Sequence, residues 1–131
     1  LSNVISINGG VQLDLMGQEN AESVGTRQLS GIGGQMDFLE GAFRSKGGKG
    51  FICINSSRVT KDGQRKSNIL ATIPGGSTIS APRTMIQYVA TEYGIASLSG
   101  KTLRERAEAM ASIAHPDFRE ELLKYARENF K

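Results

Sequence analysis

The segment after Gly100 has the strongest secondary-structure pattern in the chain, so it constrains the fold most. Thr102 and Glu105 have the spacing of a capping box. In that motif the threonine side chain accepts a hydrogen bond from the backbone N–H three residues later, and the glutamate reaches back to the cap. Apolar residues then recur at helical spacing through residues 103–114, and Pro116 is expected to end this helix.

A second helix is expected directly after the first. Asp117 followed by Glu120 repeats the capping spacing, and a second apolar face comprises Phe118, Leu122 and Tyr125. Helices with one apolar face must bury it against another layer of structure. The residues before Gly100 therefore need to supply that layer.

Those earlier residues favour short strands, because apolar and polar residues alternate over runs of a few positions. A polar hairpin is expected over residues 56–67, with Asp62-Gly63 as its turn. Strands followed by helices predict an α/β fold, and no internal repeat or linker divides residues 1–131, so we expect one domain. The expected strands cover residues 3–8, 11–17, 49–55, 68–73 and 85–94.

Composition excludes several classes of protein. The chain has 131 residues, 38% of them hydrophobic and 22% charged, which is typical of a globular domain. No apolar run approaches the roughly 20 residues that cross a bilayer, and the first residues lack the pattern of a signal peptide. Cys53 is the only cysteine, which excludes an internal disulfide and fits a reducing compartment. We interpret Cys53 as a small buried hydrophobe rather than a nucleophile.

The net charge of +3 is concentrated between Arg44 and Lys66. The aromatic residues that single-strand nucleic-acid binders interleave with such charges are missing there, so a nucleic-acid partner is disfavoured. A solvated basic loop and a site for an anionic small molecule both stay open. No pair of histidines or cysteines has metal-ligand spacing, and we interpret the lone His115 as a structural residue at a helix junction.

A glycine cluster precedes a short predicted helix in "SGIGGQMDFLEG", residues 30–41. The helix is expected over residues 35–45, with Met36, Leu39 and Phe43 on its buried face. The glycines fit neither a Rossmann fingerprint, whose sixth position here is Met36, nor a P-loop. Glycines before a helix permit a tight turn and also let a backbone approach an anion. Spacing alone favours the turn over the phosphate site.

Four sequence blocks, in this order along the chain, shift the interpretation of the glycine cluster from a tight turn toward a phosphate site: "NAESVGTRQLSGIGGQMDF", "SKGGKGF", "YVATEYGIASLSGKTLRERA" and "IAHPDFREEL". Together they resemble the C-terminal half of the acetyl-CoA hydrolase/transferase family, particularly its 4-hydroxybutyrate and butyrate/acetate CoA-transferases. The resemblance covers essentially the whole chain. It implies an open CoA-transferase-like (NagB/RpiA-like) sheet flanked by helices, with two helices at the C-terminus.

The same resemblance implies class I CoA-transferase chemistry. In the family a glutamate attacks the acyl-CoA, a glutamyl-CoA thioester forms, and CoA moves to a carboxylate acceptor. This glutamate belongs to a motif upstream of the strand that matches residues 3–8, so the chain is expected to be a fragment without the N-terminal half. Glu22 and Glu92 lie in family-like blocks but are not expected to act as the nucleophile. We therefore assign no catalytic residue to this chain.

The resemblance places CoA contacts in two loops. Gly31, Gly33 and Gly34 are expected to let the backbone approach CoA, and Lys61 matches a lysine that contacts its phosphates. Asp62 stands where the family usually has glycine, which places a negative charge beside this lysine. Asn8 and Gly9 match a strand end that faces the substrate cleft.

The expected ligands are an acyl-CoA and a small carboxylate, without a metal. The expected protein partner is the N-terminal half, and a homodimer is a further candidate. The resemblance implies a cytoplasmic protein that contacts neither nucleic acid nor membrane. Two alternatives stay open, namely an acyl-CoA hydrolase domain and a CoA-binding module without catalytic activity. The isolated 131 residues are expected to have no transferase activity.

Overall fold

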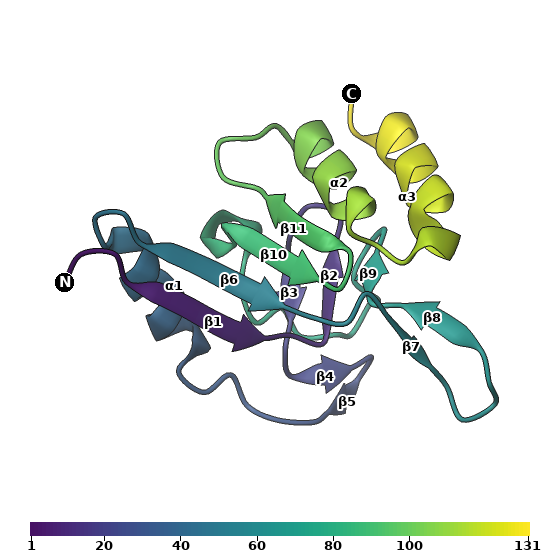
Figure 1. Ribbon diagram of the computed structural model, residues 1–131. Coiled ribbons are helices and arrows are strands. Elements are labelled where there is room, and N and C mark those ends of the chain that lie inside the picture. Colours follow the sequence, from purple (N-terminus) through teal and green to yellow (C-terminus); the bar gives the residue numbers. More distant parts are fainter.

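The computed structural model describes all residues, 1–131, and has a mixed α/β architecture built on a four-stranded sheet (Figure 1). The strand order is β1-β6-β10-β11. The first three strands are parallel and β11 pairs antiparallel with β10. Their bounds are β1 Ile5–Gly9, β6 Lys49–Cys53, β10 Tyr88–Thr91 and β11 Gly94–Ser97.

Smaller β elements lie around this sheet. One is a three-stranded sheet of order β3-β2-β9, and two are the hairpins β4–β5 and β7–β8. The predicted hairpin is confirmed, and Gly63 in its turn has a φ of 84°. The bounds are β2 Gln12–Asp14, β3 Glu19–Asn20, β4 Ser23–Val24, β5 Arg27–Gln28, β7 Ser57–Val59, β8 Arg65–Ser67 and β9 Ile69–Leu70.

Three α-helices complete the fold: α1 (Gln35–Arg44), α2 (Leu103–Ser112) and α3 (Pro116–Asn129). A short 3₁₀ helix, η1, covers Arg83–Met85. The two C-terminal helices were expected and pack against each other, while α2 also contacts β11. No helix is long and apolar enough to cross a membrane.

Helix α1 buries a different face from the one predicted. Gln35, Leu39 and Ala42 are buried, Met36 packs partly against the core, and Phe43 is 53% exposed. The expectation for Phe43 is therefore wrong. Each residue turns about 100° around a helix, so Phe43 lies about 100° from Ala42, at the edge of the buried face rather than in it.

The capping box of α2 is confirmed. The backbone N–H of Glu105 donates to Oγ1 of Thr102 at 3.2 Å, and the N–H of Thr102 donates to the Glu105 carboxylate at 3.1 Å. The helix ends at Ser112, before Pro116 is reached. Pro116 therefore does not end α2.

Pro116 instead opens α3, because it needs no partner for a missing N–H in the first helical turn. His115 is the N-cap, and its Nδ1 accepts from the backbone N–H of Asp117 at 3.2 Å. The expected capping role of Asp117 is therefore wrong. The interpretation of His115 as a junction residue agrees with this position, where its ring also lies edge-on to Tyr93 and Phe118.

Three expected strands have clearly different bounds in the structure, and the one expected over residues 11–17 is reduced to β2. The segment 68–73 forms only the two-residue strand β9, and the chain after it turns through Pro74. The predicted strand ending at Gly94 is two strands, because the chain reverses after Thr91 and returns as β11. The second strand of this hairpin was not predicted.

The four-stranded sheet is covered on one face only. Ile52, Val89 and Ala96 point into the core, together with residues of α1 and α2. Figure 1 shows α1 behind β1 and β6, and β2 and β3 near the arrowhead ends of β6 and β10. On the other face Ile5, Ile7 and Ile95 are 52%, 68% and 62% exposed. The polar residues of β1, rather than its isoleucines, therefore face the core.

Candidate functional site

The parallel strands β1, β6 and β10 end at one edge of the sheet, where α/β proteins commonly bind ligands. A cleft of about 410 Å³ lies at this edge. Gly9 and Cys53 are register partners at the ends of β1 and β6, and the N–H of Gly10 donates to the Cys53 carbonyl at 3.3 Å. The cleft is lined by Gly10, Cys53, Ile54, Asn55, Ala90 and Thr91, and none of these is a carboxylate, lysine, arginine or histidine.

Asn8 and Gly9 lie immediately before the cleft residue Gly10, at the strand end predicted for them. The side-chain amide of Asn8 donates to Oγ of Ser6 at 2.8 Å, which fixes its orientation along β1. Gly9 has open space where a Cβ would stand. Both residues are adjacent in sequence to the cleft, although neither is part of its lining.

Cys53 is exposed and lines the cleft, so the prediction of a buried cysteine is wrong. The alternation of β6 is responsible, since Gly50 and Ile52 point into the core and Cys53 lies on the opposite face. Its neighbour on that face, Phe51, stacks on Tyr88 with ring centroids 4.9 Å apart.

Glu92 follows β10 and holds the loop after β6 against it. Its carboxylate accepts from the backbone N–H of Ser56 at 3.0 Å and also from the Ser56 hydroxyl. Desolvation opposes ionisation, but these hydrogen bonds outweigh it, so the pKa of Glu92 is lowered. A carboxylate held in this way is a positioning group rather than a poised acid, in keeping with the role expected for it.

Glu19 lies directly beneath the cleft and was not singled out by the sequence. It is fully buried, and a Cβ at Gly10 would stand 2.8 Å from its Oε1. Nε2 of Gln35 donates to both carboxylate oxygens at 2.6 and 2.7 Å. Desolvation nevertheless raises the pKa of Glu19 to about 7, and the nearby charge of Glu22 adds to this. Glu19 stands in the polar run "GQENAES", which gives no local sign of burial.

Glu22, the other carboxylate in this run, is engaged by a structural partner. Oγ of Ser80 donates to its Oε2 at 2.6 Å, and its backbone N–H donates to the side chain of Asn20. These bonds tie β3 and the residues after it to the segment before η1. The contacts give Glu22 a structural role, as its exclusion as a nucleophile implies.

The glycine loop is an exposed turn that leads into α1. Gly33 has a φ of 58°, a conformation that favours glycine, and Gly34 is the N-cap of α1. No side chain caps the helix, so its first N–H groups have no side-chain acceptor. Gly31 and Gly33 have nothing within 4 Å of a Cβ position. The loop therefore combines a required turn with an open backbone surface, and it does not line the strand-end cleft.

Lys61 lies in the turn of the β7–β8 hairpin, also outside the cleft lining. The turn is closed by the N–H of Thr60, which donates to the Gln64 carbonyl at 2.8 Å. The Thr60 hydroxyl donates to the Asp62 carboxylate and lowers its pKa. Asp62 forms no salt bridge with Lys61, so the lysine is not neutralised by its neighbour.

No group of three or more histidine, cysteine, aspartate or glutamate side chains is arranged to hold a metal ion. The structure thus places Asn8 and Gly9 at the end of β1, next to the cleft residue Gly10. It leaves the glycine loop and the hairpin lysine as separate exposed elements.

An open α/β sheet with a cleft at its strand ends is typical of ligand-binding α/β proteins, which is the general class of this domain. The particular family follows from comparison, since residues 1–126 match the acetyl-CoA hydrolase/transferase C-terminal domain. The chain belongs to this family, as its motifs predicted.

Named relatives agree with that assignment. The chain is 49% identical over 126 residues to butyryl-CoA:acetate CoA-transferase of Anaerostipes caccae, covering 96% of this chain and 28% of the relative. It is 48% identical to 4-hydroxybutyrate coenzyme A transferase of Clostridium kluyveri, covering 98% and 29%. The crystal structure of RipA from Yersinia pestis superposes with a TM-score of 0.83 at 40% identity, covering 97% and 28%. The chain thus spans less than a third of the length of each.

Proposed function

We propose that this chain is the C-terminal domain of a CoA-transferase that moves CoA between an acyl-CoA and a carboxylate acceptor through a glutamyl-CoA thioester. Membership of the family carries the proposal, together with a strand-end cleft whose lining has no carboxylate. Covalent transfer divides one difficult exchange into two easier ones. The reacting glutamate is proposed to come from a part of the transferase outside residues 1–131.

In this proposal the chain contributes one wall of the cleft. Asn8 and Gly9 face the substrate from the end of β1, where Gly9 leaves room for a group to approach the backbone. Glu92 keeps its charge and positions Ser56 beside the cleft residue Asn55. Each of these residues orients or admits substrate, and none attacks it.

Two exposed elements are proposed to bind CoA. Gly31, Gly33 and Gly34 offer a backbone surface without side chains, followed by the uncapped start of α1, whose N–H groups favour an anion. Lys61 supplies an ammonium group at the hairpin turn, and the bond between Thr60 and Asp62 leaves that charge available. Both elements suit the negatively charged phosphates of CoA.

The bare face of the central sheet supports a protein partner. Sheets of parallel strands are usually covered on both faces, whereas Ile5, Ile7 and Ile95 here are more than half exposed. We propose that this face packs against the remainder of the transferase, in a sheet arrangement of the NagB/RpiA-like type. Replacing Ile7 by serine in the full-length transferase should lower its free energy of unfolding, because the apolar side chain is lost from this contact, and unchanged stability would count against the assignment.

The single free cysteine fits a reducing, cytoplasmic location for such an enzyme. The activity is tested by exchange between butyryl-CoA and acetate. The 131-residue chain alone should form no acetyl-CoA, because its cleft has no nucleophilic carboxylate. Acetyl-CoA formation that disappears in Glu22→Gln or Glu92→Gln would overturn the proposal. Release of free CoA from butyryl-CoA in the absence of acetate would instead favour an acyl-CoA hydrolase.

A further inference from the structure

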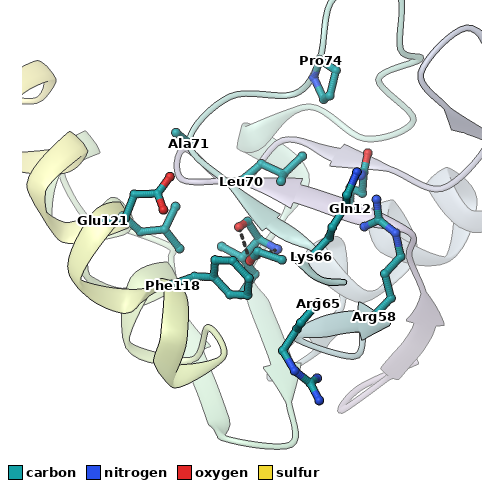
Figure 2. A pocket seen from close by; sticks show the side chains of 12 residues that line it. Gln12, Arg58, Arg65, Lys66, Leu70, Ala71, Pro74, Phe118 and Glu121 are labelled. Carbon is teal, nitrogen blue, oxygen red and sulfur yellow. Dashed lines mark hydrogen bonds between the residues drawn. The ribbon is translucent and has the colours of Figure 1, made fainter. Parts of the chain in front are cut away.

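A second cavity is separate from the strand-end cleft, because the two share no lining residue. It has a volume of about 310 Å³ and lies between the β7–β8 hairpin and α3. Figure 2 shows Phe118 and Glu121 of α3 on one side, and Gln12, Arg58 and Lys66 on the other. Small-molecule sites have volumes from about 300 Å³ upward, so the cavity can hold one ligand.

Three positive side chains line the cavity, Arg58, Arg65 and Lys66, and Arg65 donates to Oγ of Ser57 at 2.8 Å. Arg58 and Lys66 are directly opposite each other in the β7–β8 register, and neither forms a salt bridge. Like charges at directly opposite positions destabilise a strand pair. Nη1 of Arg58 donates to the side chain of Asn68 at 2.6 Å, which anchors the guanidinium at the cavity. An anion placed between these two cations would offset their repulsion. The one carboxylate of the lining, Glu121, comes from the opposite wall.

Gln12 is an independent sign of a ligand. Its side chain lines the cavity and the residue is 4% exposed, yet Oε1 is buried without a hydrogen-bond partner. Buried amides without partners are rare because they lose their bonds to water. Rotation of this amide toward the cavity would present a donor and an acceptor side by side, the arrangement that pairs with the N6 and N7 atoms of adenine.

The rest of the lining is apolar and includes an aromatic ring. Phe118 projects from α3, opposite Leu70 and Pro74 from the segment around β9. Aromatic side chains are the surfaces on which nucleic-acid bases commonly stack. The cavity therefore unites groups for a planar base with groups for an anion.

We propose that this cavity binds an adenosine phosphate, with the base near Gln12 and Phe118 and the phosphate near Arg58 and Lys66. Two molecules share this chemistry, namely a free adenine nucleotide and the nucleotide end of CoA. The site does not depend on the proposed transferase activity, because its residues are distinct from Gly31, Gly33, Gly34 and Lys61.

The test is calorimetric titration of the 131-residue chain with ADP, adenosine and ribose 5-phosphate. ADP should bind saturably, and each of the other two should bind at least about tenfold more weakly, since each lacks one set of contacts. Lys66→Gln should weaken ADP binding about tenfold. Lys46→Gln, a matched change at an exposed loop lysine, should leave it unchanged. Gln12→Leu should remove the advantage of ADP over ribose 5-phosphate.

Absence of saturable ADP binding would overturn the proposal, as would equal losses in Lys66→Gln and Lys46→Gln. ADP binding that is lost in Lys61→Ala but unaffected by Lys66→Gln would also overturn it, because the nucleotide would then occupy the hairpin turn. Lys66 is exposed, so its variant decides the outcome even if Gln12→Leu fails to fold. Competition between CoA and ADP would identify the nucleotide end of CoA as the occupant, and independent binding would identify a free nucleotide.

Discussion

Glu19 should make the stability of this domain fall as the pH rises. Burial raises its pKa in the folded chain to about 7 from 4.5, and hydrogen bonds from Gln35 offset only part of this change. Between these two pH values the folded state keeps a proton that the unfolded state has released. The free energy of unfolding therefore decreases from about pH 4.5 to about pH 7 and then levels off.

The magnitude follows from the size of the pKa change. A rise from 4.5 to about 7 corresponds to roughly 3 kcal/mol of destabilisation once the carboxyl is fully ionised in both states. Of this, about 2–3 kcal/mol develops between pH 5 and pH 8. Glu19→Gln cannot ionise, but it keeps only one acceptor for Gln35, which costs about 1 kcal/mol at any pH. The variant should therefore be slightly less stable than the parent near pH 5, and more stable by about 2 kcal/mol near pH 8.

Urea unfolding followed by circular dichroism at several pH values measures this difference. Glu120→Gln is the control, because Glu120 is an exposed carboxylate on α3. The pKa of Asp14 is also raised by burial, but that contribution is common to parent and variant and cancels in the comparison. A stability difference between Glu19→Gln and the parent that is the same near pH 5 and near pH 8 would refute the reasoning.

Three further predictions concern local structure. Thr102→Ala removes the acceptor for the Glu105 N–H and should lower the free energy of unfolding by about 1 kcal/mol in the same urea assay. Gly48→Ala places a Cβ against the Ala42 carbonyl oxygen and should lower the free energy of unfolding by about 1–3 kcal/mol. Gly75→Ala, with open space around it, should lower it little. Equal effects of the two substitutions would contradict the packing described. Cys53 should react with a maleimide in the folded chain, because it is exposed in the cleft, and labelling that requires denaturant would contradict this.

Features set by neighbouring residues could be predicted from the sequence. The capping box at Thr102 and the hairpin turn at Gly63 depend on contacts within a few positions, and both occur as expected. The first strand was expected to end at Asn8 and ends one residue later at Gly9, whereas the strand expected to reach Asn55 ends at Cys53.

Features set by contacts between residues far apart in the sequence could not be predicted. Periodicity shows that β1 has two different faces, but the position of α1 decides that Ser6 is buried and Ile7 is exposed. The same uncertainty about which face is buried led to the wrong prediction that Cys53 and Phe43 are buried. Glu19 is buried because Gln35 and the strand residues near Gly10 surround it, and nothing in its own segment shows this. The cavity beside α3 likewise requires β2, the hairpin and α3 to meet.

Calorimetric titration of CoA into the 131-residue chain tests the proposed function most directly. Saturable binding is predicted, weakened about tenfold by Lys61→Ala through the loss of a charged contact. Gly33→Val should also weaken it, because valine is strained at a φ of 58° and covers the open backbone. A chain that folds but shows no saturable CoA binding, or whose affinity is unchanged in both variants, would contradict the assignment of this domain to CoA binding.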